Sequence, residues 1–121
     1  MKVASLIIKP QALKNCQLGE IVSICEDAGL YIIDCYAINL DYADLIDFYE
    51  IRAQFPSTAE SESFIDGLSV IIGFEHEEAV SILDRLELDK EFPVYVSKEE
   101  NFAESEFDYW FGVSNTYSGR S

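Results

Sequence analysis

The sequence predicts a single α+β domain of the ferredoxin-like type, in which the order βαββαβ packs a four-stranded antiparallel sheet against helices. Four short apolar runs have the composition of strands, and the segments between them carry apolar residues at helical spacing. The 121 residues, 49% of them apolar, suffice for one compact core and leave no room for a second domain. We expect this domain over residues 1–111, and a flexible tail over residues 112–121, which are polar and lack periodicity.

The first half of the chain alternates strands with helices. Val3–Ile8 is a β-branched run that suits a buried strand, and Pro10 ends it. Helical spacing follows in Leu18, Ile21, Val22, Cys25 and Ala28. Gly29 is placed to stop that helix. Leu30–Asn39 is predicted as the second strand, and Asp34 within it indicates that one face reaches solvent or a partner.

An inserted helical pair is predicted between the second and third strands. Asp41 is a plausible N-cap for the first of these helices, and Ser57–Glu60 has the Ser-x-x-Glu form of a capping box for the second. Gly67 ends the pair. Leu68–Phe74 is then a third apolar strand, and Glu77–Leu86 carries the apolar stripe of a further helix.

The C-terminal part is predicted as a strand followed by a helix. Phe92–Val96 is the fourth strand. Ser97 and Glu100 have the spacing of another capping box, so we expect Ser97 to be the N-cap of the last helix. The apolar face of that helix is formed by Ala103, Phe107, Trp110 and Phe111.

The charge excludes several classes of partner. Eight Lys and Arg against 23 Asp and Glu give a net charge of −15, which repels nucleic acid and anionic membrane surfaces and favours a basic protein partner. The strongest apolar stretches, residues 31–38 and 70–74, fall well short of the roughly 20 residues of a membrane span. We therefore predict no nucleic-acid partner and no membrane association.

Cysteine usage and the N-terminal segment point to a reduced, cytoplasmic protein. The three cysteines lack Cys-x-x-Cys spacing, and His76 is the only histidine, so we predict no metal site and thiols that are mostly packed. The N-terminal apolar run is interrupted by Lys9 and Pro10 too early for a secretory signal.

Several segments together resemble the nucleoside diphosphate kinase family. Ile7–Leu13, which reads Ile-Ile-Lys-Pro-Gln-Ala-Leu, is similar to the family's Ile-Lys-Pro-Asp-Ala-Val strand end. Ala103–Phe111 is similar to its Ala-Glu-x-Glu-Ile-x-x-Trp-Phe helix. Between them, Leu18–Val22 and Glu26–Leu30 follow at the family's distances, and Ala43–Tyr49 resembles its helix ending in Phe-Tyr. Gly67, Val70–Glu75 and Ala79–Val80 resemble its Ser-Gly-Pro strand and the helix after it. The resemblance covers residues 3–111 and implies the same fold.

The resemblance also implies that the catalytic histidine is missing. The family carries phosphate on a histidine within Asn-x-x-His-Gly-Ser-Asp, and Phe92–Lys98 corresponds to that motif, with Tyr95 at the nucleophile. Only about one phenol in a thousand is ionised at pH 7, and a phosphotyrosine ester is too stable for return transfer. Asp84, with Arg85 beside it, stands where the family has an arginine on the helix before its long loop. That loop, which carries a phosphate-binding arginine in the family, is absent between Leu86 and Pro93.

Other family positions are retained. The resemblance implies that Lys9 is the lysine that reaches nucleotide phosphate and sugar, and that Tyr49 lies near the phosphates. Phe55 lies near the position of the aromatic residue on which the family stacks the nucleotide base. It would either hold a base or fill the shortened site, and we expect that it fills the site. Ser97 and Glu106 match the serine after the nucleophile and the glutamate that orients it. Each of these residues could instead have a purely structural role. Lys9 would then be simply exposed, Tyr49 would pack in the core, Ser97 would be a helix N-cap and Glu106 a solvated helix residue.

These observations predict a catalytically inactive member of this family that acts as an interaction or structural module. The alternatives are a nucleotide-binding sensor and a kinase with residual phosphotransfer. No cofactor is expected unless Mg-nucleotide binding survives. Strand 30–38 is apolar enough to pair across a homodimer, because an unpaired apolar edge is an aggregation hazard. By analogy with the family, a cytoskeletal or ciliary assembly is a second possible location beside the cytoplasm.

Overall fold

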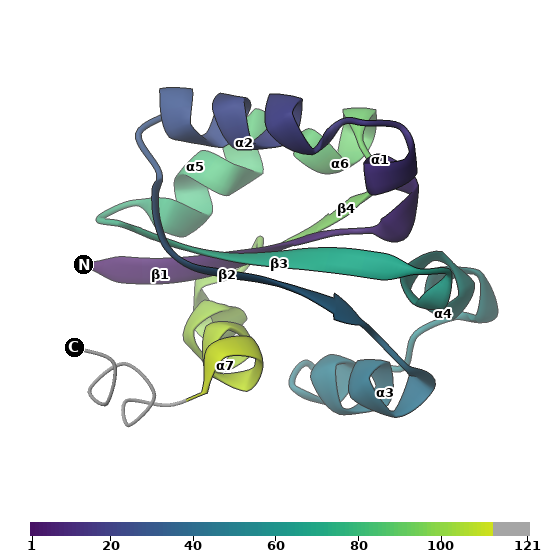
Figure 1. Ribbon diagram of the computed structural model, residues 1–121. Coiled ribbons are helices and arrows are strands. Elements are labelled where there is room, and N and C mark those ends of the chain that lie inside the picture. Colours follow the sequence, from purple (N-terminus) through teal and green to yellow (C-terminus); the bar gives the residue numbers. More distant parts are fainter. Residues whose placement is uncertain (113–121) are drawn as a thin grey trace.

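The sheet has the predicted ferredoxin-like topology. The computed structural model describes residues 1–112, so the predicted tail at residues 113–121 lies outside the described residues. The strands are β1 (Lys2–Ile8), β2 (Tyr31–Asn39), β3 (Leu68–His76) and β4 (Val94–Val96). They lie in the order β2-β3-β1-β4, and every neighbouring pair is antiparallel (Figure 1). The fold class predicted from the order of elements is therefore confirmed.

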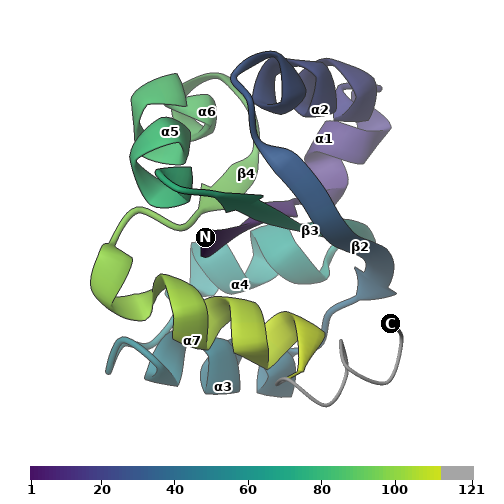
Figure 2. The same cartoon turned by 90° about the vertical axis from the view of Figure 1, so that its left-hand side faces the viewer.

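Helices cover both faces of the sheet (Figures 1 and 2). One face carries α1 (Pro10–Lys14), α2 (Leu18–Asp27), α5 (Ala79–Leu86) and α6 (Leu88–Glu91). The other carries α3 (Tyr42–Glu50), α4 (Thr58–Ile65) and α7 (Glu100–Phe111). Because side chains alternate along a strand, Leu6 and Ile8 enter the first apolar layer and Ile7 the second. Burial on both sides explains why β1 reads as a continuous apolar run.

The inserted pair α3 and α4 begins at the two predicted caps. The Asp41 side chain accepts a hydrogen bond from the backbone N–H of Asp44 at 2.8 Å. The Asp44 side chain in turn accepts one from the backbone N–H of Asp41 at 3.1 Å. Ser57 and Glu60 form the same reciprocal box, with bonds of 3.1 and 2.9 Å. Both helices therefore start where short polar side chains satisfy otherwise unpaired N–H groups.

Two short helices and one cap differ from the sequence prediction. Pro10 is the first residue of α1 and does not only end β1. Proline suits this position because it has no backbone N–H, and the first N–H groups of a helix have no partner within the helix. The one-turn α6 was not predicted. Glu99, not Ser97, is the N-cap residue of α7, and it makes no side-chain cap bond. The prediction of Ser97 as a cap is wrong because its hydroxyl turns inward to a buried carboxylate, described below.

The cysteines are all free, and only one is packed. Cys25 is fully buried on α2, and burial raises the pKa of its thiol to about 12. Cys16 and Cys35 are exposed, so the expectation of mostly packed thiols is wrong for these two. Cys16 lies in the short turn after α1, at a positive φ of 59°, and Cys35 lies on the edge strand β2.

Residues 1–112 contain no cluster of His, Cys, Asp and Glu suited to a metal ion. Within the same range, every helix is too short or too polar to cross a bilayer.

Candidate functional site

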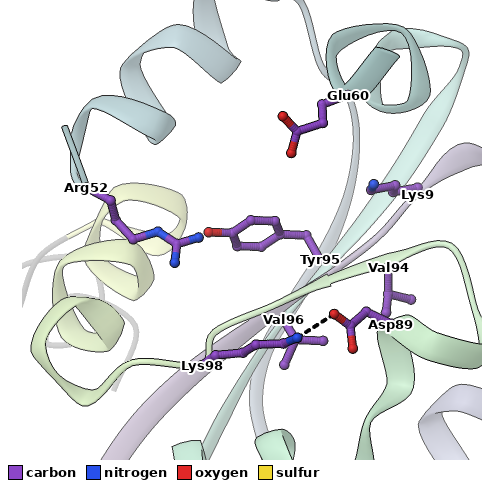
Figure 3. A pocket seen from close by; sticks show the side chains of 8 residues that line it. All are labelled: Lys9, Arg52, Glu60, Asp89, Val94, Tyr95, Val96 and Lys98. Carbon is purple, nitrogen blue, oxygen red and sulfur yellow. Dashed lines mark hydrogen bonds and ion pairs between the residues drawn. The ribbon is translucent and has the colours of Figure 1, made fainter. Parts of the chain in front are cut away.

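A hollow of ≈ 380 Å³ opens beside β4, and we call it the β4 hollow (Figure 3). Lys9, directly after β1, lies on one side, and Lys98, two residues after β4, lies on the other. Asp89 comes from α6 and Glu60 from α4, and Arg52 follows α3. Val94, Tyr95 and Val96 of β4 complete the lining. Three cations and two carboxylates thus converge on one strand.

Tyr95 lies at the centre of the hollow, with its ring held by aromatic packing. The ring contacts Phe48 at a centroid distance of 5.2 Å, and Tyr49 and Phe64 at 6.2 Å each. The Arg52 guanidinium carbon lies 5.3 Å from the ring centroid, within range of a cation–π interaction. These three aromatic contacts and the Arg52 guanidinium hold the Tyr95 ring in place.

Glu106 is a buried carboxylate that contacts Tyr95 and lies near Arg52, two residues that line the hollow. Its side chain is 2% exposed, although it is ionisable. Oε2 accepts from the Tyr95 hydroxyl at 3.1 Å, and Oε1 accepts from the Ser97 hydroxyl at 2.9 Å. The Ser97 hydroxyl also lies 3.2 Å from that of Ser5 on β1. The alternative of a solvated helix residue is thus wrong for Glu106.

Burial dominates the ionisation of Glu106. Removal from water raises the pKa of its carboxyl, and the Ser97 hydrogen bond and the Arg52 charge oppose that rise. Arg52 Nε lies 3.5 Å from Glu106 Oε2, and Arg52 also faces Glu99 at 3.8 Å. The Glu106 carboxyl, the Tyr95 phenol, the Ser97 hydroxyl and the Arg52 guanidinium thus form one network, of which Tyr95 and Arg52 line the hollow.

Lys9 and Glu60 form the opposite wall. The Lys9 ammonium lies 4.6 Å from the Phe64 ring centroid, and burial lowers its pKa against the charges of Glu60 and Asp89. The backbone N–H of Ser57 is the main cause of a lowered pKa at Glu60, and the hydroxyl of Tyr49 adds to it. The alternative of a simply exposed Lys9 is not what the structure shows.

Tyr49 and Phe55 do not line the hollow. Tyr49 is 6% exposed and belongs to the core, although its hydroxyl donates to Glu60 Oε2 at 3.0 Å. It therefore acts on the hollow only through Glu60. Phe55 is 77% exposed and lines a separate hollow with Ile46 and Glu50. The expectation that Phe55 plugs the site is wrong, because the chain after α3 turns its ring outward.

Comparison with known proteins places this architecture in a family. Residues 3–87 match the family model for nucleoside diphosphate kinase. The chain belongs to the nucleoside diphosphate kinase family. It is 36% identical over 76 residues to a nucleoside diphosphate kinase of Chlamydia muridarum, covering 62% of this chain and 54% of that protein. The corresponding protein of Helicobacter pylori is 33% identical over 76 residues, with 62% and 56% covered. The chain thus spans about half the length of these curated relatives.

Solved nucleoside diphosphate kinase structures share the fold over a longer range. The enzyme from Encephalitozoon cuniculi superposes with a TM-score of 0.82 at 21% identity, over 93% of this chain and 90% of that one. An NDP kinase from Pyrobaculum aerophilum gives 0.72 at 17% identity, over 91% and 95%. At these identities the likeness establishes the fold alone.

The family-model match ends before β4 and α7, where Tyr95, Ser97 and Glu106 lie. Their assignment to the nucleoside diphosphate kinase motif therefore stays a prediction. The structure adds that the hydroxyls of Tyr95 and Ser97 both donate to the Glu106 carboxylate.

His76 lies at the far end of the sheet from the hollow. It pairs with Lys2 in the β1–β3 register, seven residues along β1 from Lys9, or roughly 23 Å at strand spacing. Its Nδ1 accepts from the Glu78 N–H at 2.9 Å. The only histidine of this nucleoside diphosphate kinase family member is thus too distant to act at the hollow.

Sequence reasoning missed four charged residues that line the hollow. Asp84 and Arg85, which it considered, lie exposed on α5 and outside the lining, and Arg52 is the arginine in contact with Tyr95. Glu60 was noticed only as a helix cap. The four missed residues are Arg52, Glu60, Asp89 and Lys98. They come from four separate places in the chain, and no short sequence spacing connects them.

Proposed function

We propose that this chain is a nucleoside diphosphate kinase family member without histidine-based phosphotransfer, and that it serves as an interaction or structural module. The observation that carries the proposal is the tyrosine at the centre of the site, whose hydroxyl donates to Glu106. A neutral imidazole supplies a nucleophilic nitrogen near pH 7, whereas a phenol is a poor nucleophile there, and the hydroxyl of this one donates to Glu106.

The charge pattern of the hollow supports the same proposal. Phosphoryl transfer relies on cations that are free to stabilise phosphate charge. Here Lys98 is paired with Asp89, Arg52 faces Glu99 and Glu106, and Lys9 lies in the field of Glu60. A nucleotide phosphate would have to displace carboxylates inside a molecule of net charge −15.

The first prediction concerns transfer itself. Incubated with γ-labelled Mg-ATP and then Mg-GDP, the wild-type protein should form neither phosphoprotein nor labelled GTP. Tyr95→His should also fail to turn over, because the imidazole would restore the nucleophile but not free the paired cations. Tyr95→Phe is the matched control that keeps the ring without the hydroxyl. Labelled GTP from the wild type would contradict the proposal and favour the alternative of a kinase with residual phosphotransfer.

A second candidate function is nucleotide binding without transfer, favoured by the meeting of Lys9, Arg52 and Lys98 at one hollow. Mg-nucleotide would then be the only cofactor. Isothermal titration with Mg-ADP and Mg-ATP should show no heat of binding up to millimolar nucleotide if the inactive module is right. Micromolar binding that vanishes in Lys9→Ala and persists in Lys14→Ala would establish the sensor instead. Lys14 suits this comparison because it pairs with Asp66, outside the hollow lining.

Self-association through β2 is proposed alongside these functions. β2 is an edge strand of the sheet, and its first residue, Tyr31, is 67% exposed. An uncovered edge strand offers unpaired backbone groups to another chain. A clean monomer by light scattering at high concentration would contradict this dimer. The basic protein partner, the absence of nucleic-acid binding and the cytoplasmic location remain predictions from charge and cysteine usage.

A further inference from the structure

The outer edge of β4 forms one wall of the β4 hollow. β4 is the last strand of the sheet, and among the described residues only β1 pairs with it. Its register places Ile7 opposite Tyr95, with Leu6 opposite Val96 and Ile8 opposite Val94. The side of β4 that faces away from β1 is therefore a sheet edge within reach of a ligand.

The printed hydrogen bonds show which backbone groups face that edge. The Ser97 N–H donates to the Ser5 carbonyl at 3.2 Å, and the Lys9 N–H donates to the Pro93 carbonyl at 3.0 Å. In an antiparallel ladder, hydrogen-bonded pairs alternate with non-bonded ones, so Tyr95 also bonds to β1. The N–H and C=O groups of Val94 and Val96 must then point away from β1.

Three of these outward groups are directed at the hollow. The Val94 N–H is used locally, because it donates to the Phe92 carbonyl at 2.9 Å. The Val94 carbonyl and both backbone groups of Val96 remain on the outer side. The two valine side chains are only 5% and 4% exposed and pack in the core layer, so these residues line the hollow through their backbone.

Arg52 adds a charged contact beside this edge. Its nearest carboxylate oxygens, on Glu106 and Glu99, lie at 3.5 and 3.8 Å, beyond the 2.7–3.2 Å range typical of a good N–H···O bond. A guanidinium has five N–H donors, so Arg52 can take a closer carboxylate without giving up its place over Tyr95.

The ion pair between Lys98 and Asp89 lies beside the outer edge of β4. It joins a residue before β4 to one after it, and so runs alongside the strand (Figure 3). Lysine on an edge strand is a common device against unwanted pairing. The two side chains are 42% and 31% exposed, and such a surface pair contributes little to stability. An uncharged peptide backbone can therefore displace it, whereas a phosphate would bring its own negative charge next to the released Asp89 carboxylate.

We propose that the β4 hollow binds an extended peptide segment of a partner protein, which adds as a strand to β4 and places a carboxylate against Arg52. The inference rests on the proposed function as an interaction module and names the kind of partner segment. Two outward carbonyls, with Glu60 and Asp89, repel a polyanion but accept the N–H groups of a peptide. One acidic side chain matches the single arginine, whereas a nucleotide would bring several negative charges.

The test begins with selection of random heptapeptides displayed on phage against the wild-type protein. The selected peptides are then synthesised and their affinity is measured by fluorescence anisotropy. Val96→Pro removes the outward N–H without removing a β1 ladder bond, and should weaken binding at least about tenfold. Val96→Ala keeps that N–H and shortens the same side chain, so binding should be weakened far more in Val96→Pro than in Val96→Ala. Replacing the acidic peptide residue by its amide should also weaken binding.

A second series makes the result independent of whether Val96→Pro folds. Each backbone amide of the selected peptide is N-methylated in turn. Strand addition predicts that methylation weakens binding at two amides spaced two residues apart, those that face the Val94 and Val96 carbonyls, and is tolerated at the amide between them.

Three results would overturn the strand-addition proposal. They are a selection that enriches no peptide, equal binding to folded Val96→Pro and Val96→Ala, and N-methyl effects without a period of two. Mg-ADP binding that is lost in Lys9→Ala, with no peptide selected, would assign the hollow to nucleotide instead. The phosphotransfer assay decides the proposed inactivity separately, whatever the peptides do.

Discussion

Gly73→Ala is expected to lower the free energy of unfolding by about 1–3 kcal/mol, the usual effect of forcing an extra methyl group into a packed core. Gly73 lies in β3 on the side covered by α7, where a Cβ would come within 2.5 Å of Phe107 Cε2 and 2.9 Å of Phe111 Cε2. The two rings pack on each other at 4.7 Å, so neither can move aside freely. Urea unfolding followed by circular dichroism measures the change.

Gly19→Ala is the matched control for this prediction. Gly19 lies in α2, and an added Cβ would have no neighbouring atom within 4 Å. Alanine is favoured over glycine in a helix by roughly 1 kcal/mol, so this variant should be more stable than the wild type. If Gly73→Ala unfolded at the same urea concentration as the wild type, the close packing of α7 on β3 would be contradicted.

The second large effect is a pH dependence that originates at Glu106. The pKa of its carboxyl is raised in the folded protein above the ordinary value of 4.5, mainly by burial. Between the unfolded and folded pKa values, the folded state binds more protons than the unfolded state. The contribution of this group to stability is therefore greatest below pH 4.5 and decreases as the pH rises through the folded pKa.

Glu106→Gln should remove this contribution while preserving the shape of the side chain. The difference in unfolding free energy, variant minus wild type, should increase with pH above 4.5 and then level off once the wild-type carboxyl is ionised in both states. Urea titrations at a series of pH values measure it. Glu104→Gln, an exposed position on the same helix, is the control and should show no such slope. A difference that fell with rising pH would refute the burial argument.

The same site shows what local sequence could not supply. Arg52 follows α3 with no periodic or capping signal, and it becomes a site residue only because α3 and α7 bring it over Tyr95 and beside Glu106. Ser97 had two possible roles, and the spacing to Glu100 favoured a helix cap. The buried carboxylate of Glu106 decided otherwise, because a desolvated charge requires donors more strongly than a helix end that water can reach.

By itself, the sequence determined the βαββαβ order and the N-caps of both inserted helices, Asp41 and Ser57. Those features depend on neighbouring residues, since strand runs, helical stripes and caps are read within one turn or one strand. Only the tertiary structure decided the outward turn of Phe55, the burial of Glu106 and the open edge of β4. Each of these features depends on how elements that are far apart in the chain pack together. Such packing cannot be predicted from the pattern of neighbouring residues.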